Sequence, residues 1–117
     1  MYESVVSEKA MMFAIRMVRL YQYMKTEQKE YVLSKQLLRS GTSIGANVAE
    51  AVAAVSRRDF LNKMYIAFKE CSETLYWLEL LHRTDYLTAP QYQSLKTDCI
   101  ELRRILSSIT KTTRDTV

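Results

Sequence analysis

Few residues of this chain have the types and spacing that catalysis or metal binding requires. Glu70 and Glu73 could act as paired carboxylates in acid–base chemistry, but neither a nucleophile nor a His accompanies them. Glu79-x-x-His82 has the Glu-x-x-His spacing of di-iron bundles, which need a second copy of the motif and two further carboxylates. Because His82 is the only His in the chain, that ligand set fails within one subunit. We expect no enzyme activity, no cofactor and no metal, unless subunits share ligands, and interpret His82 as a helix C-terminal partner or a capped core residue.

Length and composition restrict the fold. The chain has 117 residues, enough for one domain over residues 1–117. Two Gly and one Pro are too few for the turns of a many-stranded sandwich or barrel, or for the glycine-rich loops of Rossmann and P-loop sites. No apolar run approaches the roughly 20 residues that span a bilayer, and the N-terminus carries no secretion signal. We expect a cytoplasmic protein that binds no membrane, and we infer no small-molecule substrate.

The two cysteines fit the interior of such a protein. Cys71 and Cys99 each lie within an apolar helical pattern. We interpret them as reduced core thiols, with a single disulfide between them as the alternative.

Apolar residues recur at spacings of three and four in four segments, which is the signature of amphipathic helices. Ser56 followed by Asp59 predicts the start of the third helix, and the sequence from Thr88 to Gln91, with Pro90 in the first turn, predicts the start of the fourth. The predicted helices cover about residues 5–25, 31–54, 57–84 and 89–111, followed by a frayed polar tail from Thr112. Their short connections predict an all-α, antiparallel, up-down-up-down four-helix bundle, with a swapped-helix arrangement as the alternative.

The second predicted helix contains two glycines on one face, Gly41 and Gly45. Each costs about 1 kcal/mol relative to Ala inside a helix, so a reason is required. The favoured reason is close packing of a neighbouring helix, and the alternative is the approach of a ligand or an RNA backbone.

Polar residues border the apolar stripes of the second and third predicted helices. An antiparallel hairpin that turns near Ser56 would place Glu50 beside Lys63, and Arg39 beside Glu73. Half-buried polar groups need partners, so we expect an interhelical network that fixes the register of this pair. Its members are Arg39, Ser43, Asn47, Glu50, Lys63, Glu70 and Glu73, with Ser43 near Glu70.

Apolar side chains exceed what one small bundle can bury, because several helices carry a second apolar stripe. Such surfaces indicate self-association or a partner protein. The candidates for an oligomer interface are Met11, Ile15, Val18, Tyr65, Tyr76, Trp77 and Leu80. We therefore expect a homo-oligomer.

Basic residues fall in small groups, and the formal net charge is +4. One interpretation is a solvated surface of mixed sign. The other is a surface that contacts phosphates when subunits assemble and their charges add, without sequence-specific readout. The candidate residues for nucleic-acid binding are Arg16, Arg19, Lys35, Arg57, Arg58, Arg103 and Arg104.

Two blocks of the sequence resemble a known family. They are QLLRSGTSIGANVAEA at residues 36–51 and SRRDF at residues 56–60, followed by Lys63, Ala67, Lys69, Glu70, Glu73, the Tyr76-Trp77-Leu78 run and a closing Leu-rich helix. These residues resemble the "four helix bundle protein" family, whose first members were encoded in intervening sequences of bacterial 23S rRNA genes. The chain departs from it at Gly45, where many members carry Pro, and at residues 51–54, where they have a Gly-containing turn.

The resemblance implies a cytoplasmic bacterial four-helix bundle that assembles as a ring-like homopentamer and has no established enzyme activity. The seven network residues match polar positions of the family, and we interpret them as structural. The family's bundle is similar to accessory proteins of diversity-generating retroelements, which are thought to bind nucleic acid and a reverse transcriptase. We therefore expect a non-enzymatic homopentamer that binds RNA or DNA non-specifically through an assembled basic surface. The alternative is a protein–protein interaction module that does not bind nucleic acid.

Overall fold

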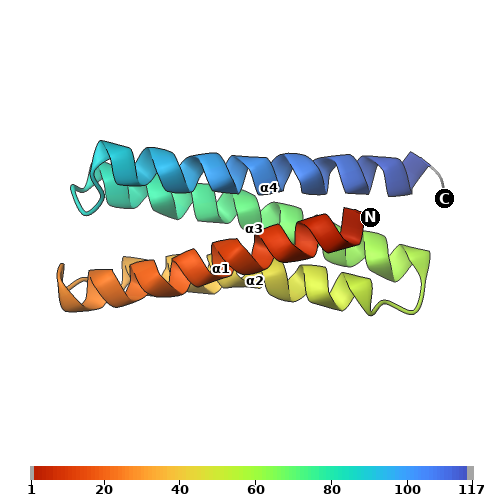
Figure 1. Cartoon of the computed structure of the whole chain (residues 1–117), viewed down its shortest axis with the longest axis horizontal. Helices are drawn as coiled ribbons and strands as arrows, with labels where there is room; N and C mark the ends of the chain where they lie inside the picture. Colours follow the sequence, from red (N-terminus) through yellow and green to blue (C-terminus); the bar gives the residue numbers. More distant parts are fainter. Residues whose placement is uncertain (1, 116–117) are drawn as a thin grey trace.

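Four helices arranged as a ring of neighbours form the structure, a computed structural model that describes residues 2–115. The helices are α1 (Tyr2–Thr26), α2 (Leu33–Val52), α3 (Arg57–Arg83) and α4 (Ala89–Asp115). Each contacts the next along the chain, and α4 contacts α1 in a less extensive seam. The α1/α2 pair therefore lies opposite the α3/α4 pair, and both termini lie at the same end as the α2–α3 connection (Figure 1). The predicted antiparallel four-helix bundle is confirmed.

The core consists of the apolar stripes that define the helices. Phe13 and Met17 of α1, Ile44 of α2 and Leu78 of α3 are almost completely buried, with Leu106 of α4 beside them. Burying one large apolar side chain stabilises the folded state by about 1.5–3 kcal/mol, and this burial holds the helices together. Within the described residues, no helix is long and apolar enough to cross a membrane.

The two cysteines face each other inside this core. Cys71 and Cys99 are both buried free thiols, so the disulfide alternative is wrong. The thiol of Cys99 donates to the backbone carbonyl of Cys71 at 3.4 Å. The hydrogen bond between the Cys71 and Cys99 side chains, followed by burial, raises the pKa of the Cys71 thiol, which makes it unreactive in the folded protein.

The structure corrects the predicted ends of three helices. α1 begins at Tyr2 rather than near residue 5, and α2 ends at Val52 rather than near residue 54. α2 begins at Leu33 rather than near residue 31. Before it, Lys29 adopts a left-handed backbone conformation (φ 56°), which is not helical and delays the start of the helix. α4 continues to Asp115, where a frayed tail was expected from Thr112, since Thr113 is buried against the bundle. Residues 116–117 of that tail lie outside the described residues.

Glu30 starts α2 from outside the helix. Its carboxylate accepts backbone hydrogen bonds from Val32, Leu33 and Ser34 at 2.7–3.0 Å, which satisfies donors that a helix start leaves unpaired. Burial raises the pKa of Glu30, but these bonds outweigh it, so its pKa is lower than the ordinary value.

The other connections contain the predicted caps. Ser56 accepts from the backbone N–H of Asp59 at 3.0 Å, and Thr88 and Gln91 exchange reciprocal bonds at the start of α4. His82 bonds the carbonyl of Leu87 at 3.1 Å and stacks on Tyr92. The His82 side chain therefore has a structural role, but its partner lies in the loop after α3 rather than at the end of the helix.

The two glycines have different surroundings. A Cβ on Gly41 would overlap Cγ and Sδ of Met17, so this buried side chain of α1 would have to shift before any side chain could fit at Gly41. A Cβ on Gly45 would lie 3.5 Å from the carbonyl oxygen of Ala10, an ordinary contact. Helix packing thus explains Gly41 fully and Gly45 only in part.

Candidate functional site

A polar network joins α2 to α3. Arg39 of α2 forms ion pairs with Glu70 (3.3 Å) and with Glu73, and Glu50 pairs with Lys63 at 2.9 Å. The hydrogen bonds and charge of the acidic partners raise the pKa values of Arg39 and Lys63. The pairs expected from the hairpin register are therefore present, and Arg39 also occupies the position expected for Ser43 beside Glu70.

Ser43 and Asn47 bond along α2 instead of across to α3. The Ser43 hydroxyl donates to the carbonyl of Arg39 at 2.7 Å, and the Asn47 amide donates to the carbonyl of Ser43 at 2.8 Å. The interhelical hydroxyl contact is deeper, where Thr74 donates to Ser40 at 3.0 Å and both residues are buried. Sequence reasoning missed this pair because both residues lie within the apolar stripes.

Trp77 belongs to the same network. Its indole N–H donates to Glu73 at 2.9 Å, and its ring meets that of Tyr76 edge-on with centroids 5.0 Å apart. The bond from Trp77, followed by the one from Arg39, lowers the pKa of Glu73, so this carboxylate stays ionised. Trp77 and Leu80 are half-buried, whereas Tyr76 is exposed.

The candidate interface residues divide between two surfaces. Met11, Ile15 and Val18 form an exposed stripe on α1. Beside it, a shallow groove of about 280 Å³ runs between α1 and α2, lined by Ser7, Met11, Ala14, Thr42, Gly45, Ala46, Val48 and Ala49. We call this stripe and groove the apolar face. Tyr65 and Tyr76 lie on α3, in the pair of helices opposite.

The candidate nucleic-acid residues are scattered over all four helices. Arg16 is bound to Asp98 of α4 at 2.5 Å, so its charge is already paired. Arg19 and Lys35 are exposed on α1 and α2, while Arg57 and Arg58 begin α3. Arg103 and Arg104 lie on α4, where Arg103 is half-buried and Arg104 is exposed.

On the α3/α4 pair, cations form two aligned rows. The residues of α3 at helical spacings of three and four are Arg58, Leu61, Tyr65, Lys69, Ser72 and Tyr76, and those of α4 are Lys96, Ile100, Arg103, Ser107, Lys111 and Arg114. Arg114 lies beside Tyr65, and α3 and α4 pack antiparallel against each other, so the rows run along each other (Figure 1). We call these two rows the basic face.

The basic face contains six cations and no carboxylate. The chain has 17 Lys and Arg against 13 Asp and Glu, so the 11 cations elsewhere are outnumbered. The whole formal excess of positive charge therefore lies on this face. Asp115 is beside it and pairs with Arg114 at 3.4 Å. Sequence reasoning missed Lys69 and Lys96 because each stands alone in the sequence, and only the antiparallel pairing brings them beside other cations.

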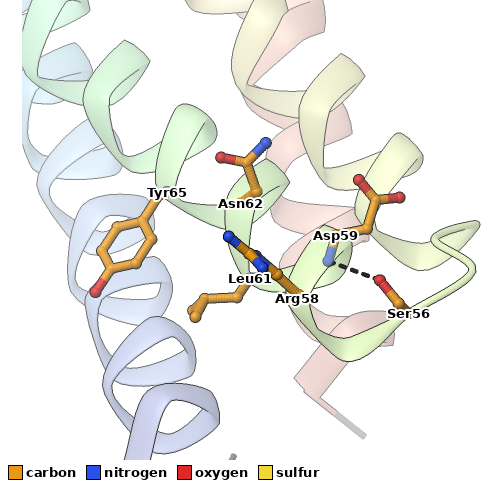
Figure 2. A pocket seen from close by; sticks show the side chains of 6 residues that line it. All are labelled: Ser56, Arg58, Asp59, Leu61, Asn62 and Tyr65. Carbon is orange, nitrogen blue, oxygen red and sulfur yellow. Dashed lines mark hydrogen bonds between the residues drawn. The ribbon is translucent and has the colours of Figure 1, made fainter.

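A hollow opens at the end of the basic face where α3 begins. It has a volume of about 580 Å³ and is lined by Ser56, Arg58, Asp59, Leu61, Asn62 and Tyr65. In Figure 2 the Tyr65 ring lies on the side of α3 toward α4, and the Asp59 carboxylate points to the other side. The arrangement offers cations and an aromatic ring to a ligand, without a nucleophile. In the described residues, no group of His, Cys, Asp and Glu could hold a metal ion.

Comparison with known proteins agrees with the sequence resemblance. The family model of the 23S rRNA-intervening sequence protein matches residues 2–108. A crystal structure of a protein with unknown function from the S23 ribosomal protein family, from Bacteroides thetaiotaomicron VPI-5482, is 56% identical, with a TM-score of 0.94 over 95% of this chain and 99% of the other. None of the curated proteins compared matches the chain. The family match spans nearly all of the bundle, and the chain belongs to the 23S rRNA-intervening sequence protein family.

Proposed function

We propose that this chain forms a non-enzymatic homo-oligomer that binds RNA or DNA non-specifically through its basic face. The observation that carries the proposal is the separation of apolar and basic surfaces onto opposite helix pairs. A surface that combines six cations with two bordering carboxylates, Asp59 and Asp115, still attracts a polyanion, since each phosphate contact releases condensed counterions. The α1/α2 pair is then available for self-association.

The apolar face supports the assembly part of the proposal. Met11, Ile15 and Val18 are 58%, 39% and 43% exposed, so three large apolar side chains in one row remain in contact with water in the single chain. The small residues of the neighbouring groove allow close approach of a second helix. The number five comes from the resemblance to the four-helix-bundle family, and five chains would add their charges to about +20.

Native mass spectrometry of the untagged protein tests the assembly. A pentamer of 13.7 kDa chains has a mass of about 68 kDa. A mass of one chain would overturn the assembly and with it the added charge.

Salt-dependent RNA binding tests the function. If six phosphates are contacted per chain, the logarithm of the affinity for single-stranded RNA should fall with the logarithm of salt concentration with a slope of about −4. Lys69→Glu with Lys111→Glu should weaken binding at least tenfold and reduce the slope. Lys25→Glu with Lys29→Glu is the matched control, because both lysines are exposed and lie outside the basic face.

Two outcomes contradict the proposal. Equal weakening by both pairs of substitutions would mean that net charge alone, and not this face, determines binding. Absence of binding by the wild-type protein at low salt would favour the alternative, a protein–protein interaction module that uses the exposed Tyr65 and Tyr76.

A further inference from the structure

We propose that the basic face binds single-stranded nucleic acid in preference to duplex, because bases stack on Tyr65 and Tyr76. This inference rests on the proposed function and specifies its ligand. Both tyrosines belong to the α3 row, Tyr65 between Arg58 and Lys69 and Tyr76 at the end of the row, and they are 36% and 59% exposed. Non-specific single-strand binding typically combines a cationic track with aromatic rings on which bases stack.

Tyr76 is held in place from below. The ring of Trp77 meets the exposed Tyr76 ring edge-on and supports it on one side. Trp77 is fixed in turn by its bond to Glu73, and Glu73 by Arg39 of α2. The polar network between α2 and α3 therefore reduces the freedom that Tyr76 would lose on stacking, which favours binding.

Tyr65 is supported from the neighbouring helix α4. Arg114 of α4 lies beside it, and Lys69 follows one turn later on α3. Tyr65 also borders the hollow lined by Arg58, Asn62 and Asp59, which has room for a base (Figure 2). The ring thus stands at the edge of an open space and between two positive charges.

The spacing of the two rings favours a single strand. They are 11 residues apart on one helix, or about 16 Å at 1.5 Å per residue, with Lys69 between them. A single strand can splay its bases onto both rings while its phosphates meet the cations of α4. A duplex keeps its bases stacked inside and presents only phosphates, so it uses the charges and leaves both tyrosines unused.

The test separates stacking from charge with three DNA probes of 12 nucleotides. They are a mixed-sequence single strand, an abasic strand with the same number of phosphates, and a duplex of the same sequence. The wild-type protein should bind the single strand at least tenfold more tightly than the abasic strand. Tyr65→Leu and Tyr76→Leu should each weaken binding of the single strand roughly tenfold and leave binding of the abasic strand unchanged. The corresponding Phe variants keep the ring and should bind like the wild type.

Tyr31→Leu is the matched control, because Tyr31 is 50% exposed in the α1–α2 connection, outside the basic face. Equal affinity of the wild type for the single strand and the abasic strand would overturn the stacking inference while leaving the proposed function intact. A duplex bound more tightly than the single strand would also overturn it. Absence of binding to all three probes would overturn both proposals.

Discussion

The indole N–H of Trp77 donates to the carboxylate of Glu73 at 2.9 Å, one helical turn earlier on α3. The same carboxylate oxygen accepts from Arg39 of α2. One oxygen atom of Glu73 therefore links α2 to α3 and also holds the Trp77 ring that supports Tyr76. A change on α2 can thus alter the exposed surface of α3 without touching it.

The coupling between Arg39 and Glu73 can be measured. We expect a double-mutant cycle with Arg39→Ala and Glu73→Ala to give a coupling energy of about 0.5–1 kcal/mol, because the pair is half-exposed and its Coulomb energy is partly screened. Urea unfolding of the four proteins at one protein concentration provides the free energies. A coupling below about 0.2 kcal/mol would show that the network does not fix the register.

Acid should destabilise the bundle through Glu30 and Glu73. The folded-state pKa of each is lowered from an ordinary value of 4.5, so their contribution to stability is complete above that pH and is lost as the pH falls through the folded-state values. Unfolding free energies measured from pH 7 to pH 2 should therefore be level at first and decline below about pH 4.5.

Glu30→Gln tests the part due to the start of α2. We expect it to lower the unfolding free energy by about 1–2 kcal/mol at pH 7, because a neutral amide oxygen replaces a carboxylate that accepts three backbone bonds. The decline in acid should also become shallower. Glu27→Gln is the control, since Glu27 is exposed in the same connection, and an equal effect of both substitutions would argue against capping by Glu30.

Periodicity was sufficient to predict the bundle from the sequence, because the apolar spacing of each helix and the caps at Ser56 and Thr88 are local signals. The register of α2 against α3 followed from a hairpin centred near one residue. The start of α2 could not be predicted in the same way. Glu30 caps it from three residues before the first helical position, after a left-handed residue, which matches no standard capping motif.

The basic face was only partly predictable for a different reason. The sequence groups Arg57 with Arg58 and Arg103 with Arg104 because they are adjacent, but adjacent helical residues point in different directions. Lys69 and Lys96 lie far from other cations in the chain, and the antiparallel contact between α3 and α4 brings them into one surface. The apolar candidates likewise lie on two surfaces, because the arrangement of the helices places α1 and α3 in different pairs.

The two glycines of α2 should respond oppositely to a methyl group. Gly41→Ala should lower the unfolding free energy by about 1–3 kcal/mol, because the new Cβ would overlap Met17 at 2.4 Å. Gly45→Ala should leave it unchanged or raise it by up to about 1 kcal/mol, since the helix gains propensity and the nearest atom is at an ordinary distance. Thermal or urea unfolding checks both, and similar effects of the two substitutions would contradict the packing explanation of Gly41.

Met11 and Met12 provide a matched test of the apolar face. They are adjacent on α1 and almost equally exposed, at 58% and 55%. Met11 lines the groove toward α2, whereas Met12 lines the one toward α4, whose charged residues are Glu8, Lys9, Asp98 and Glu101. Met11→Lys should therefore place a charge inside the proposed subunit interface and reduce the native mass to that of smaller species, because an unpaired buried charge costs several kcal/mol. Met12→Lys places the same charge near carboxylates and should keep the mass of the wild type, with both variants retaining helical circular dichroism. If both variants keep the wild-type mass, or both lose it, subunits do not associate through the α1/α2 groove.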